Sequence, residues 1–592
     1  MKVVLTTLNA KYIHSSLALR YLKRYCRGSA DIVVREFSIN NGLLQVLGEL
    51  YREQPDVVGF ACYIWNAEQT FELARLLKKV LPETVVVAGG PEVSYDAAGI
   101  LEANACIDYI IQGEGEAVLA GLLEALQNRS PQAVPGVCSR RDGRAEEGVP
   151  QVMSSLDDIP FPYGAEDMVS LKDKILYYES SRGCPFTCQY CLSGRAAGVR
   201  FLSRERVLAD LAFFISHGVK QVKFVDRTFN ARKDHYFPIL KYLAAQDCLT
   251  NFHFEIAADI LDDEVLAFLE NAPAGRFQFE IGIQSTHEAT LQEIKRTNNW
   301  PRIVANVGKL LSYGNIHLHL DLIAGLPYED YRRFARSFNE VYALRPHMLQ
   351  LGFLKLLKGS GLRQRAEDHG YVFMDAAPYE VLANRYITYG EIRRLKMLEE
   401  VFDQVYNTGR FAATLAWLER LFPDAFSLYE ALAEFWESRN LQLSSHGGKA
   451  LFGHLAEFCR KVRPAAVEAC LEFLKFDALR LDSGNTRPEF LPWDGAEEAE
   501  RKTAFWREAG RVRKYLPGFA FTSWRDLKKC YHIETFSYDI PGYLAGAGEL
   551  SRQRTIVLFS YSGSSAADYQ AIVPEDFRQG GQSCAIAPIR NI

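Results

Sequence analysis

Three cysteines within eight residues, Cys184, Cys188 and Cys191, are the strongest sign of chemistry in this 592-residue chain. Their CxxxCxxC spacing gathers three thiolates on one short loop, with no fourth cysteine or histidine inside it. A structural zinc site uses four ligands, whereas three thiolates can hold three irons of a [4Fe–4S] cluster. The fourth iron then lacks a protein ligand, and an open metal position is typical of catalysis. The alternative is a zinc site completed by a distant Cys or His.

The segment that must position these cysteines alternates strands and helices. Short β-branched runs, each followed by an amphipathic stretch, recur from Ile175 to Leu362 and predict parallel βαβ units. Six such units indicate an incomplete, open barrel, a partial (βα)6 fold, with the cysteines on the loop after its first strand. The expected strands are ILYYESS (175–181), QVKFVD (221–226), NFHFEIA (251–257), RFQFEIGI (276–283), IHLHLDLIA (316–324) and MLQLGFLKLL (348–357).

The cysteine spacing, with Tyr190 before the last cysteine, resembles that of the radical S-adenosylmethionine (SAM) superfamily. Segments at four later strand ends are similar to SAM-binding segments of that superfamily. Each segment alone is also typical of an ordinary buried strand, but their order after the cysteines supports the resemblance, which covers Leu176 to Leu362. The segments are FVDRTFN (224–230), FEIGIQS (279–285), DLIAGLP (321–327) and QLGFLKLLKGSGL (350–362).

The resemblance implies a [4Fe–4S] cluster on the three cysteines, with SAM bound through its amino and carboxylate groups to the open iron. One electron from the reduced cluster then cleaves SAM to a 5′-deoxyadenosyl radical. It further implies an external electron donor such as flavodoxin or ferredoxin. The residues expected to contact SAM are Tyr190, Asp226, Arg227, Glu255, Glu280, Gln284, Ser285 and Asp321.

Residues 1–150 show a second alternation of strands and helices, which predicts a doubly wound, Rossmann-like domain with ligand space at the carboxyl ends of its strands. The turns Gly89–Pro91 and Gly113–Gly115 both fall at such ends. Placed before a radical SAM barrel, this domain resembles the cobalamin-binding subgroup of the superfamily, including members that have a dedicated C-terminal domain. The residues expected at the cobalamin are Asn9, Lys11, Tyr12, Ile13, His14, Tyr63, Trp65, Asn66, Gly89, Gly90, Pro91, Glu92, Gly113, Glu114 and Gly115.

One motif of other cobalamin proteins is absent. No DxHxxG sequence, which supplies an axial histidine to cobalt, follows the first strand, and His14 is the one histidine of residues 1–150. His14 is either a ligand or a polar residue at a helix start. Tyr63, Trp65 and Asn66 either face the corrin ring or form ordinary packing beside a helix N-terminus. We therefore expect cobalamin to bind without an axial histidine from the protein.

The remaining segments complete the expected organisation. A linker is predicted over 151–174, and amphipathic helices at 380–407, 412–422, 426–438 and 465–481 predict a mainly helical domain with a mixed α/β end over 363–592. We expect this domain to cap the barrel mouth and exclude water. The stretch 501–529 holds nine Lys or Arg with Trp506, Tyr515 and Trp524. It is interpreted as a solvated helix face that docks onto an acidic barrel, and alternatively as a nucleic-acid contact.

Composition sets the broad class. Apolar residues make up 48% and charged residues 24%, and the formal net charge is −5, values of an ordinary globular protein without a general attraction to nucleic acid. No apolar run approaches the ~18–20 residues of a membrane span, and the N-terminus lacks a signal-peptide pattern. A cytoplasmic protein is expected, and the nine other cysteines are scattered and expected to be reduced.

Two enzymatic functions and one non-enzymatic function follow from these observations. The resemblance favours a cobalamin-dependent methyltransferase that transfers a methyl group to an unactivated carbon of an unidentified substrate. A radical SAM enzyme that catalyses a rearrangement, a cyclisation or sulfur insertion is the alternative. A non-enzymatic iron–sulfur or zinc module that binds RNA is the third hypothesis, and the three-cysteine motif argues against it.

Overall fold

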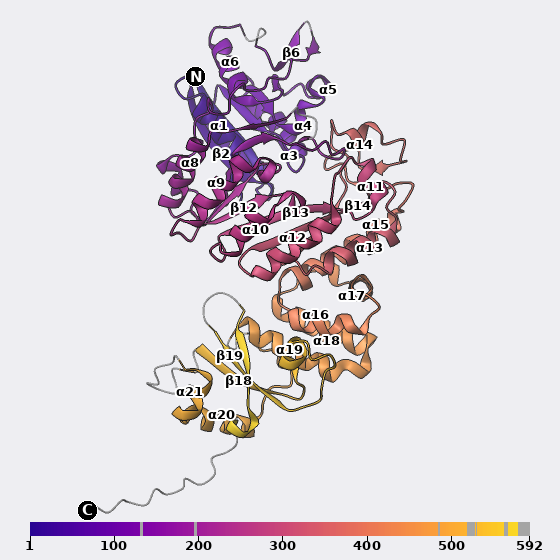
Figure 1. Cartoon of the computed structure of the whole chain (residues 1–592). Helices are drawn as coiled ribbons and strands as arrows, with labels where there is room; N and C mark the ends of the chain where they lie inside the picture. The colour runs from indigo at the N-terminus through magenta and orange to yellow at the C-terminus, as the bar shows by residue number, and fades with distance from the viewer. Residues whose placement is uncertain are drawn as a thin grey trace, which may run out of the picture. The chain divides into compact units, whose positions relative to one another are not determined.

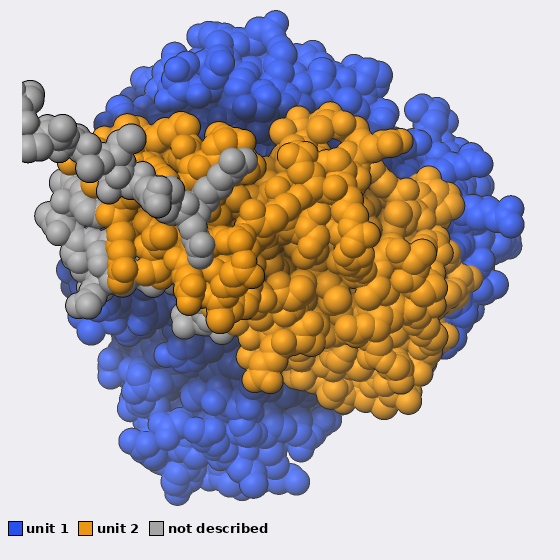
Figure 2. Space-filling view, turned by 90° about the horizontal axis from the view of Figure 1, so that it is seen from below, with its two compact units in different colours: residues 1–392 blue, residues 393–592 orange. Residues whose placement is uncertain are grey.

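A computed structural model describes residues 1–577 apart from 131–133, 142, 194–197, 483–485, 518–526, 528–529 and 562–565. The chain forms two compact units, residues 1–392 and 393–592 (Figures 1 and 2). Among the described residues, no helix combines the length and apolar character that crossing a bilayer requires.

The first unit begins with a seven-stranded sheet in the order β2-β1-β3-β4-β5-β6-β7. Strands β1 to β5 are parallel, and β6 and β7 add an antiparallel hairpin at one edge. The order reverses beside β1, and such a switch point is where doubly wound domains bind ligands. The strands are β1 (Lys2–Asn9), β2 (Asp31–Ser38), β3 (Val57–Ala61), β4 (Val85–Gly89), β5 (Tyr109–Ile111), β6 (Val137–Arg141) and β7 (Arg144–Glu146). The helices are α1 (Leu17–Tyr25), α2 (Leu43–Glu53), α3 (Ala67–Val80), α4 (Pro91–Ser94), α5 (Ala97–Ala103) and α6 (Gly115–Gln127).

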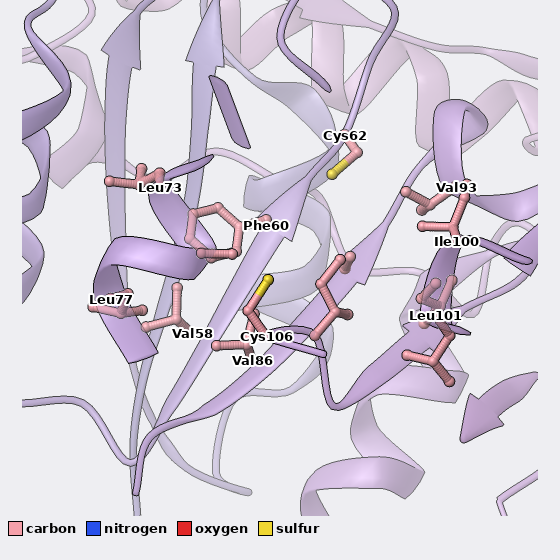
Figure 3. Close-up of a cluster of buried hydrophobic side chains, with 14 of the residues drawn as sticks. Val58, Phe60, Cys62, Leu73, Leu77, Val86, Val93, Ile100, Leu101 and Cys106 are labelled. Carbon is pink, nitrogen blue, oxygen red and sulfur yellow. The ribbon is translucent and has the colours of Figure 1, made fainter. Parts of the chain in front are cut away.

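Neighbouring residues of each strand point to opposite sides of this sheet, and helices cover both sides. Both faces are therefore buried. Val58 and Phe60 pack on one side against Leu73 and Leu77 of α3 (Figure 3). On the other side, Val57 and Ala61 lie in a second cluster with residues of α1 and α6. The predicted doubly wound domain is confirmed.

Asn66 joins the ends of β1 and β3 at the switch point. Its side chain is buried, and its amide nitrogen donates to Thr7 Oγ1 (3.1 Å), to the Leu8 carbonyl (3.0 Å) and to the Ala61 carbonyl (3.2 Å). Its amide oxygen accepts from the backbone N–H of Tyr63 at 2.8 Å. Together with Thr7 Oγ1 and Trp65 Nε1, which donate to the same two carbonyls, Asn66 satisfies polar groups at the ends of these strands.

A six-stranded parallel sheet follows, in the order β15-β14-β13-β12-β11-β8, and confirms the partial (βα)6 barrel. Helices α10 and α12 run along one side of it (Figure 1). Its strands are β8 (Leu176–Tyr178), β11 (Gln221–Phe224), β12 (Asn251–Glu255), β13 (Phe277–Gln284), β14 (His317–Ala324) and β15 (Met348–Phe353). The helices are α7 (Ala165–Met168) before the barrel, then α8 (Arg204–Ser216), α9 (Lys233–Ala244), α10 (Asp263–Glu270), α11 (Glu288–Glu293), α12 (Trp300–Tyr313) and α13 (Tyr331–Tyr342).

The residues after β15 differ from the expected helix over 380–407. Val381–Ala383 forms strand β17, which pairs with β16 (Val372–Phe373), and helix α15 (Tyr389–Phe402) begins only afterwards. The backbone N–H of Val381 donates to the Leu354 carbonyl. This contact with the barrel stabilises an extended strand here, although the sequence has the periodicity of a helix. The predicted domain limits at 151, 175 and 363 stay predictions.

The second unit is helical and then mixed. A three-stranded antiparallel sheet contains β18 (Tyr531–Phe536), β19 (Thr555–Ser560) and β20 (Asp568–Ile572). Its helices include α16 (Ala412–Leu418), α17 (Ala425–Ser438), α18 (Gly448–Val462), α19 (Val467–Leu481), α20 (Ala496–Arg507), α21 (Ala509–Tyr515) and α23 (Ile540–Leu544). That this unit caps the barrel stays a prediction.

The basic stretch 501–529 pairs within its own unit. Lys502 contacts Asp494 (2.8 Å) and Glu534 (2.9 Å), and Lys514 contacts Asp576 (2.5 Å). Trp506 is buried, and Trp524 lies outside the described residues. Because Lys502 and Lys514 already have acidic partners, their charges do not support a nucleic-acid contact.

We expect Asn66→Ala to loosen the switch point at a cost of about 2 kcal/mol, because the Tyr63 N–H loses its acceptor and the Leu8 and Ala61 carbonyls each lose one of two donors. Amide hydrogen exchange of peptides from these strands in the full chain should become roughly 30-fold faster. Asn40→Ala, which removes an exposed side chain of the same domain, is the control. Equal exchange in both variants would contradict the role given to Asn66.

Candidate functional site

The three cysteines line one cavity of about 190 Å³ at the carboxyl ends of the barrel strands. They lie between the short strands β9 (Ser181–Gly183) and β10 (Val199–Phe201), which pair as an antiparallel hairpin. No other Cys or His is among the described residues that line this cavity. This supports the three-thiolate interpretation over a zinc site closed by a fourth ligand.

Two neighbours hold the cysteine loop. Arg296 donates from Nη1 to Tyr190 OH (3.1 Å) and to Cys188 Sγ (3.7 Å), and its other Nη donates to the Gly282 carbonyl. Thr228 Oγ1 lies 3.6 Å from Cys184 Sγ. Burial raises the pKa of the Cys188 thiol, and the Arg296 guanidinium opposes that shift. A cation beside the sulfur favours the thiolate that a metal needs.

Most residues expected at SAM meet at this cavity. Gln284 lies there with a left-handed φ of 69°, at a register shift between β13 and β14, and its Oε1 is buried without a hydrogen-bond partner. A non-glycine residue in that region of φ costs free energy that the surrounding structure must supply. The members of the expected set that line the cavity are Tyr190, Arg227, Glu255, Glu280, Gln284 and Asp321.

The structure does not bring Asp226 and Ser285 to the cavity. The Asp226 carboxylate is buried and accepts from Ser180 N (2.9 Å), Ser180 Oγ (2.7 Å) and Ser181 Oγ (2.5 Å). Ser285 Oγ donates to Glu329 Oε1 at 2.7 Å. Because both side chains already have protein partners, the geometry favours a positioning role for each, and their contact with SAM stays a prediction.

A larger cavity of about 760 Å³ lies at the strand ends of the N-terminal sheet and reaches the barrel. Pockets of this size hold large organic ligands. Residues from β1, β3, β4 and β5 line it together with Tyr177, Glu179 and Arg182 of the barrel. Of the residues expected at cobalamin, it contains Asn9, His14, Tyr63, Trp65, Gly89, Gly90, Pro91, Gly113, Glu114 and Gly115.

Five other residues of that expected set do not line this cavity. Asn66 binds backbone groups, and Glu92 contacts Tyr379 OH and Lys358 Nζ, the latter at 3.4 Å. Tyr12 and Ile13 are exposed, and Lys11 is exposed beside them. The contact of Lys11, Tyr12, Ile13, Asn66 and Glu92 with a corrinoid therefore stays a prediction without support from this geometry.

His14 and two aromatic side chains line the larger cavity. The His14 Nδ1 lies 2.7 Å from Tyr177 OH, and burial together with Lys11 and Lys223 lowers the pKa of the ring. Tyr63 and Trp65 are stacked, with ring centroids 4.5 Å apart and planes at 6°. A flat apolar surface of this kind suits contact with a flat ligand.

Arg182 is a residue that the sequence reasoning missed. Its guanidinium contacts Glu179 (2.7 Å), Glu114 (3.5 Å) and Glu116, and Arg200 also pairs with Glu114. The hairpin that carries the cysteines is thus tied to the turn after β5. Arg182 directly precedes Gly183 and Cys184, so its proximity to the motif was the available signal.

Comparisons with known proteins match the two domains of the first unit and part of the chain after them. A family described as "B12 binding domain" matches residues 3–123, "Radical SAM superfamily" matches 178–341, and "Protein of unknown function (DUF4080)" matches 367–559. The cobalamin-dependent radical SAM methyltransferase TokK of Streptomyces tokunonensis is 28% identical over 48% of this chain and 44% of its own length. An anaerobic magnesium-protoporphyrin IX monomethyl ester cyclase of Synechocystis is 30% identical over 38% and 46%.

Among solved structures, the cobalamin-dependent SAM radical enzyme OxsB with aqua-cobalamin and SAM bound gives a TM-score of 0.57 at 16% identity, over 81% of this chain and 79% of that one. The chain spans about half the length of the curated relatives that it matches. It combines a B12-binding domain with a radical SAM domain and is homologous to cobalamin-dependent radical SAM methyltransferases. These domain families imply three cofactors: cobalamin, a [4Fe–4S] cluster and SAM.

The residues present fit these cofactors. Three thiols face one cavity for the cluster, the orphaned Oε1 of Gln284 lies beside them, and a large cavity with a flat aromatic wall suits cobalamin. In the larger cavity Gly90 has a φ of 111°, and a Cβ there would lie 2.5 Å from the Cys62 carbonyl oxygen. Only glycine fits this turn without strain.

We expect Cys188→Ala to abolish the broad iron–sulfur absorbance near ~400 nm in anaerobically reconstituted protein, because two thiolates cannot hold a [4Fe–4S] cluster. Cys248→Ala is the control, since that half-buried cysteine does not line the cavity. A full cluster in Cys188→Ala would refute the ligand assignment.

Proposed function

We propose that this protein is a cobalamin-dependent radical SAM methyltransferase that acts on an unactivated carbon of its substrate. The observation that carries the proposal is that the cysteine cavity and the larger cavity share a wall residue, Arg227. When bound, the cluster and SAM supply a 5′-deoxyadenosyl radical and cobalamin supplies a methyl group. Adjacent cavities let both reach one substrate.

Arg227 and Glu255 support SAM binding in the smaller cavity. Arg227 is exposed and lines both cavities, and its side chain has no hydrogen-bond or ion-pair partner among the described residues. Burial and the nearby Glu280 raise the pKa of Glu255 to about 7. A guanidinium and a carboxyl group in one cavity complement the carboxylate and ammonium of the methionine end of SAM.

The larger cavity supports cobalamin without a histidine ligand from the protein. His14, the one candidate, already shares a hydrogen bond with Tyr177, which fixes its ring against the first barrel strand. The Tyr63–Trp65 stack offers an apolar wall, and Gly89 and Gly115 offer backbone that a ligand can approach closely.

A cyclase or another non-methylating radical enzyme is the second candidate. One observation favours it: the Synechocystis relative, at 30% identity, is named for a cyclisation rather than a methylation. Both candidates use the same two cavities, so the products of SAM distinguish them.

We expect the reconstituted protein, given a reductant, cobalamin and a metabolite extract, to form both S-adenosylhomocysteine and 5′-deoxyadenosine from SAM. The first product remains when SAM gives up its methyl group, and the second reports radical formation. Liquid chromatography with mass detection measures both. Formation of 5′-deoxyadenosine alone would favour the second candidate, and formation of neither would contradict both.

In the same assay Arg227→Met should lower both products about tenfold at subsaturating SAM, because a charge-assisted hydrogen bond contributes about 1.5–3 kcal/mol. Arg204→Met, a change at an exposed arginine that lines neither cavity, is the matched control. Equal rates in the two variants would remove Arg227 from the site.

We expect Gly89→Val to weaken corrinoid retention, and His14→Ala to leave it unchanged. A Cβ at Gly89 meets only Ile111 at an ordinary 3.7 Å, so the fold tolerates the change while the added methyl groups crowd the cavity. Absorbance of corrinoid retained after desalting measures binding, and electron paramagnetic resonance (EPR) of the cob(II)alamin form shows any nitrogen ligand to cobalt. Loss of a nitrogen signal in His14→Ala would overturn the claim that the protein supplies no axial histidine.

A further inference from the structure

A layer of ionisable side chains crosses the inside of the barrel. His319 and Asp321 are two residues apart on β14 and therefore share a face of the strand. Glu280 on the neighbouring β13 stands directly opposite His319 in the register. One ligand atom of each of these three residues lies within 4.8 Å of those of the other two.

The ring of His319 and the carboxylate of Asp321 are in close contact and largely buried. His319 Nε2 lies 3.0 Å from Asp321 Oδ1, yet both atoms are buried without a hydrogen-bond partner. The His319 side chain is 8% exposed and the residue 6%. The Asp321 carboxylate raises the pKa of the His319 ring, so charge stabilises this pair although the two atoms lack hydrogen-bond geometry. A metal ion offers both atoms a partner, since two ligands at ~2.1 Å from one ion lie ~3–4 Å apart.

Carboxylates and basic groups both surround this layer. Glu255, Glu280 and Asp321 all line the cysteine cavity, and burial raises the pKa of Asp321. Lys223 faces them: its Nζ lies 2.9 Å from Glu280 Oε2, which also lies 3.0 Å from His253 Nε2. Lys223 and His253 thus stabilise the charge of Glu280, Arg227 lies near Glu255, and His319 is the close partner of Asp321.

We propose that Glu280, His319 and Asp321 bind a divalent transition-metal ion, of the class of Mn²⁺, Fe²⁺ or Zn²⁺, beside the cysteine cavity that Glu280 and Asp321 line. An imidazole with two carboxylates selects such ions over Mg²⁺ and Ca²⁺, which prefer oxygen ligands, and over the soft ions that thiolates select. Three protein ligands leave positions open toward the cavity, where an oxygen atom of a substrate can coordinate. The site depends on the barrel alone and stands independently of the proposed methyl transfer.

Glu280 and Asp321 also belong to the residues expected at SAM, so the two assignments compete for the same carboxylates. The test therefore measures metal binding directly, without reference to turnover. Full-length protein with a reconstituted [4Fe–4S] cluster is dialysed under anaerobic conditions and titrated with Mn²⁺, with free Mn²⁺ followed by EPR. We expect saturation at about one Mn²⁺ per chain.

His319→Gln and Asp321→Asn should each weaken Mn²⁺ binding at least tenfold. The matched control is His317→Gln, the same substitution two residues earlier on the same face of β14, where the ring packs against His347 (5.0 Å between centroids) and not in the layer. Cys188→Ala should still bind Mn²⁺, which separates this site from the cysteines. Unchanged cluster absorbance and melting temperature in His319→Gln show that its barrel is folded.

Two results would overturn the proposal. One is the absence of saturable Mn²⁺ binding to the wild-type chain, and the other is equal affinity in His319→Gln and His317→Gln. If Mn²⁺ binds as expected while no SAM product forms, the metal site holds and the proposed function fails. If SAM products form while Mn²⁺ does not bind, the proposed function holds and the metal site fails.

Discussion

The ion pairs of Arg182 join the two sites. This side chain is 15% exposed and lies among Glu114, Glu116 and Glu179, so its charge is removed from most of the solvent. Burial alone would lower the pKa of the guanidinium, but Glu179 and Glu116 outweigh it and raise the pKa. Breaking one partner of a buried ion pair costs about 3–5 kcal/mol, because the other charge stays uncompensated. The hairpin β9–β10 therefore cannot leave the turn after β5 without that loss.

This link sets the geometry of both cavities at once. Arg182 immediately precedes the turn into the cysteine loop, and Glu114 belongs to the glycine turn of the larger cavity. Arg200 on the other hairpin strand reaches the same Glu114, so both strands are anchored at one point. A cofactor on the N-terminal sheet and one on the cysteines are thereby held at a defined separation, which a flexible linker could not achieve.

The elements that end near the sites could be predicted from the sequence because their signals are local. β-branched runs and amphipathic stretches mark the eleven parallel strands, and the carboxyl ends of parallel strands lie at one edge. Partners across the chain carry no such signal. Asp226 and Ser285 occupy strand ends like their neighbours, yet Ser180 and Glu329 engage them, and those contacts exist only in the folded barrel. The prediction of a helix that begins at Glu380 was wrong for the same reason, since the Val381 N–H donates to the Leu354 carbonyl, which lies far away in the sequence.

The lining of the cysteine cavity favours a positively charged ligand. Its walls hold Glu255, Glu280 and Asp321 against Arg227 and Arg296, and Arg296 is already committed to Tyr190 and Cys188. Burial raises the pKa of Glu255 and of Asp321, whereas His253 and Lys223 lower the pKa of Glu280 to about 2. Glu255 and Asp321 therefore either stay protonated or gain a cation. SAM is a sulfonium with an ammonium group, and a divalent ion bound to His319 would add positive charge beside the same carboxylates. An acidic floor and a cationic ligand therefore stabilise each other, whichever of the carboxylates each one contacts.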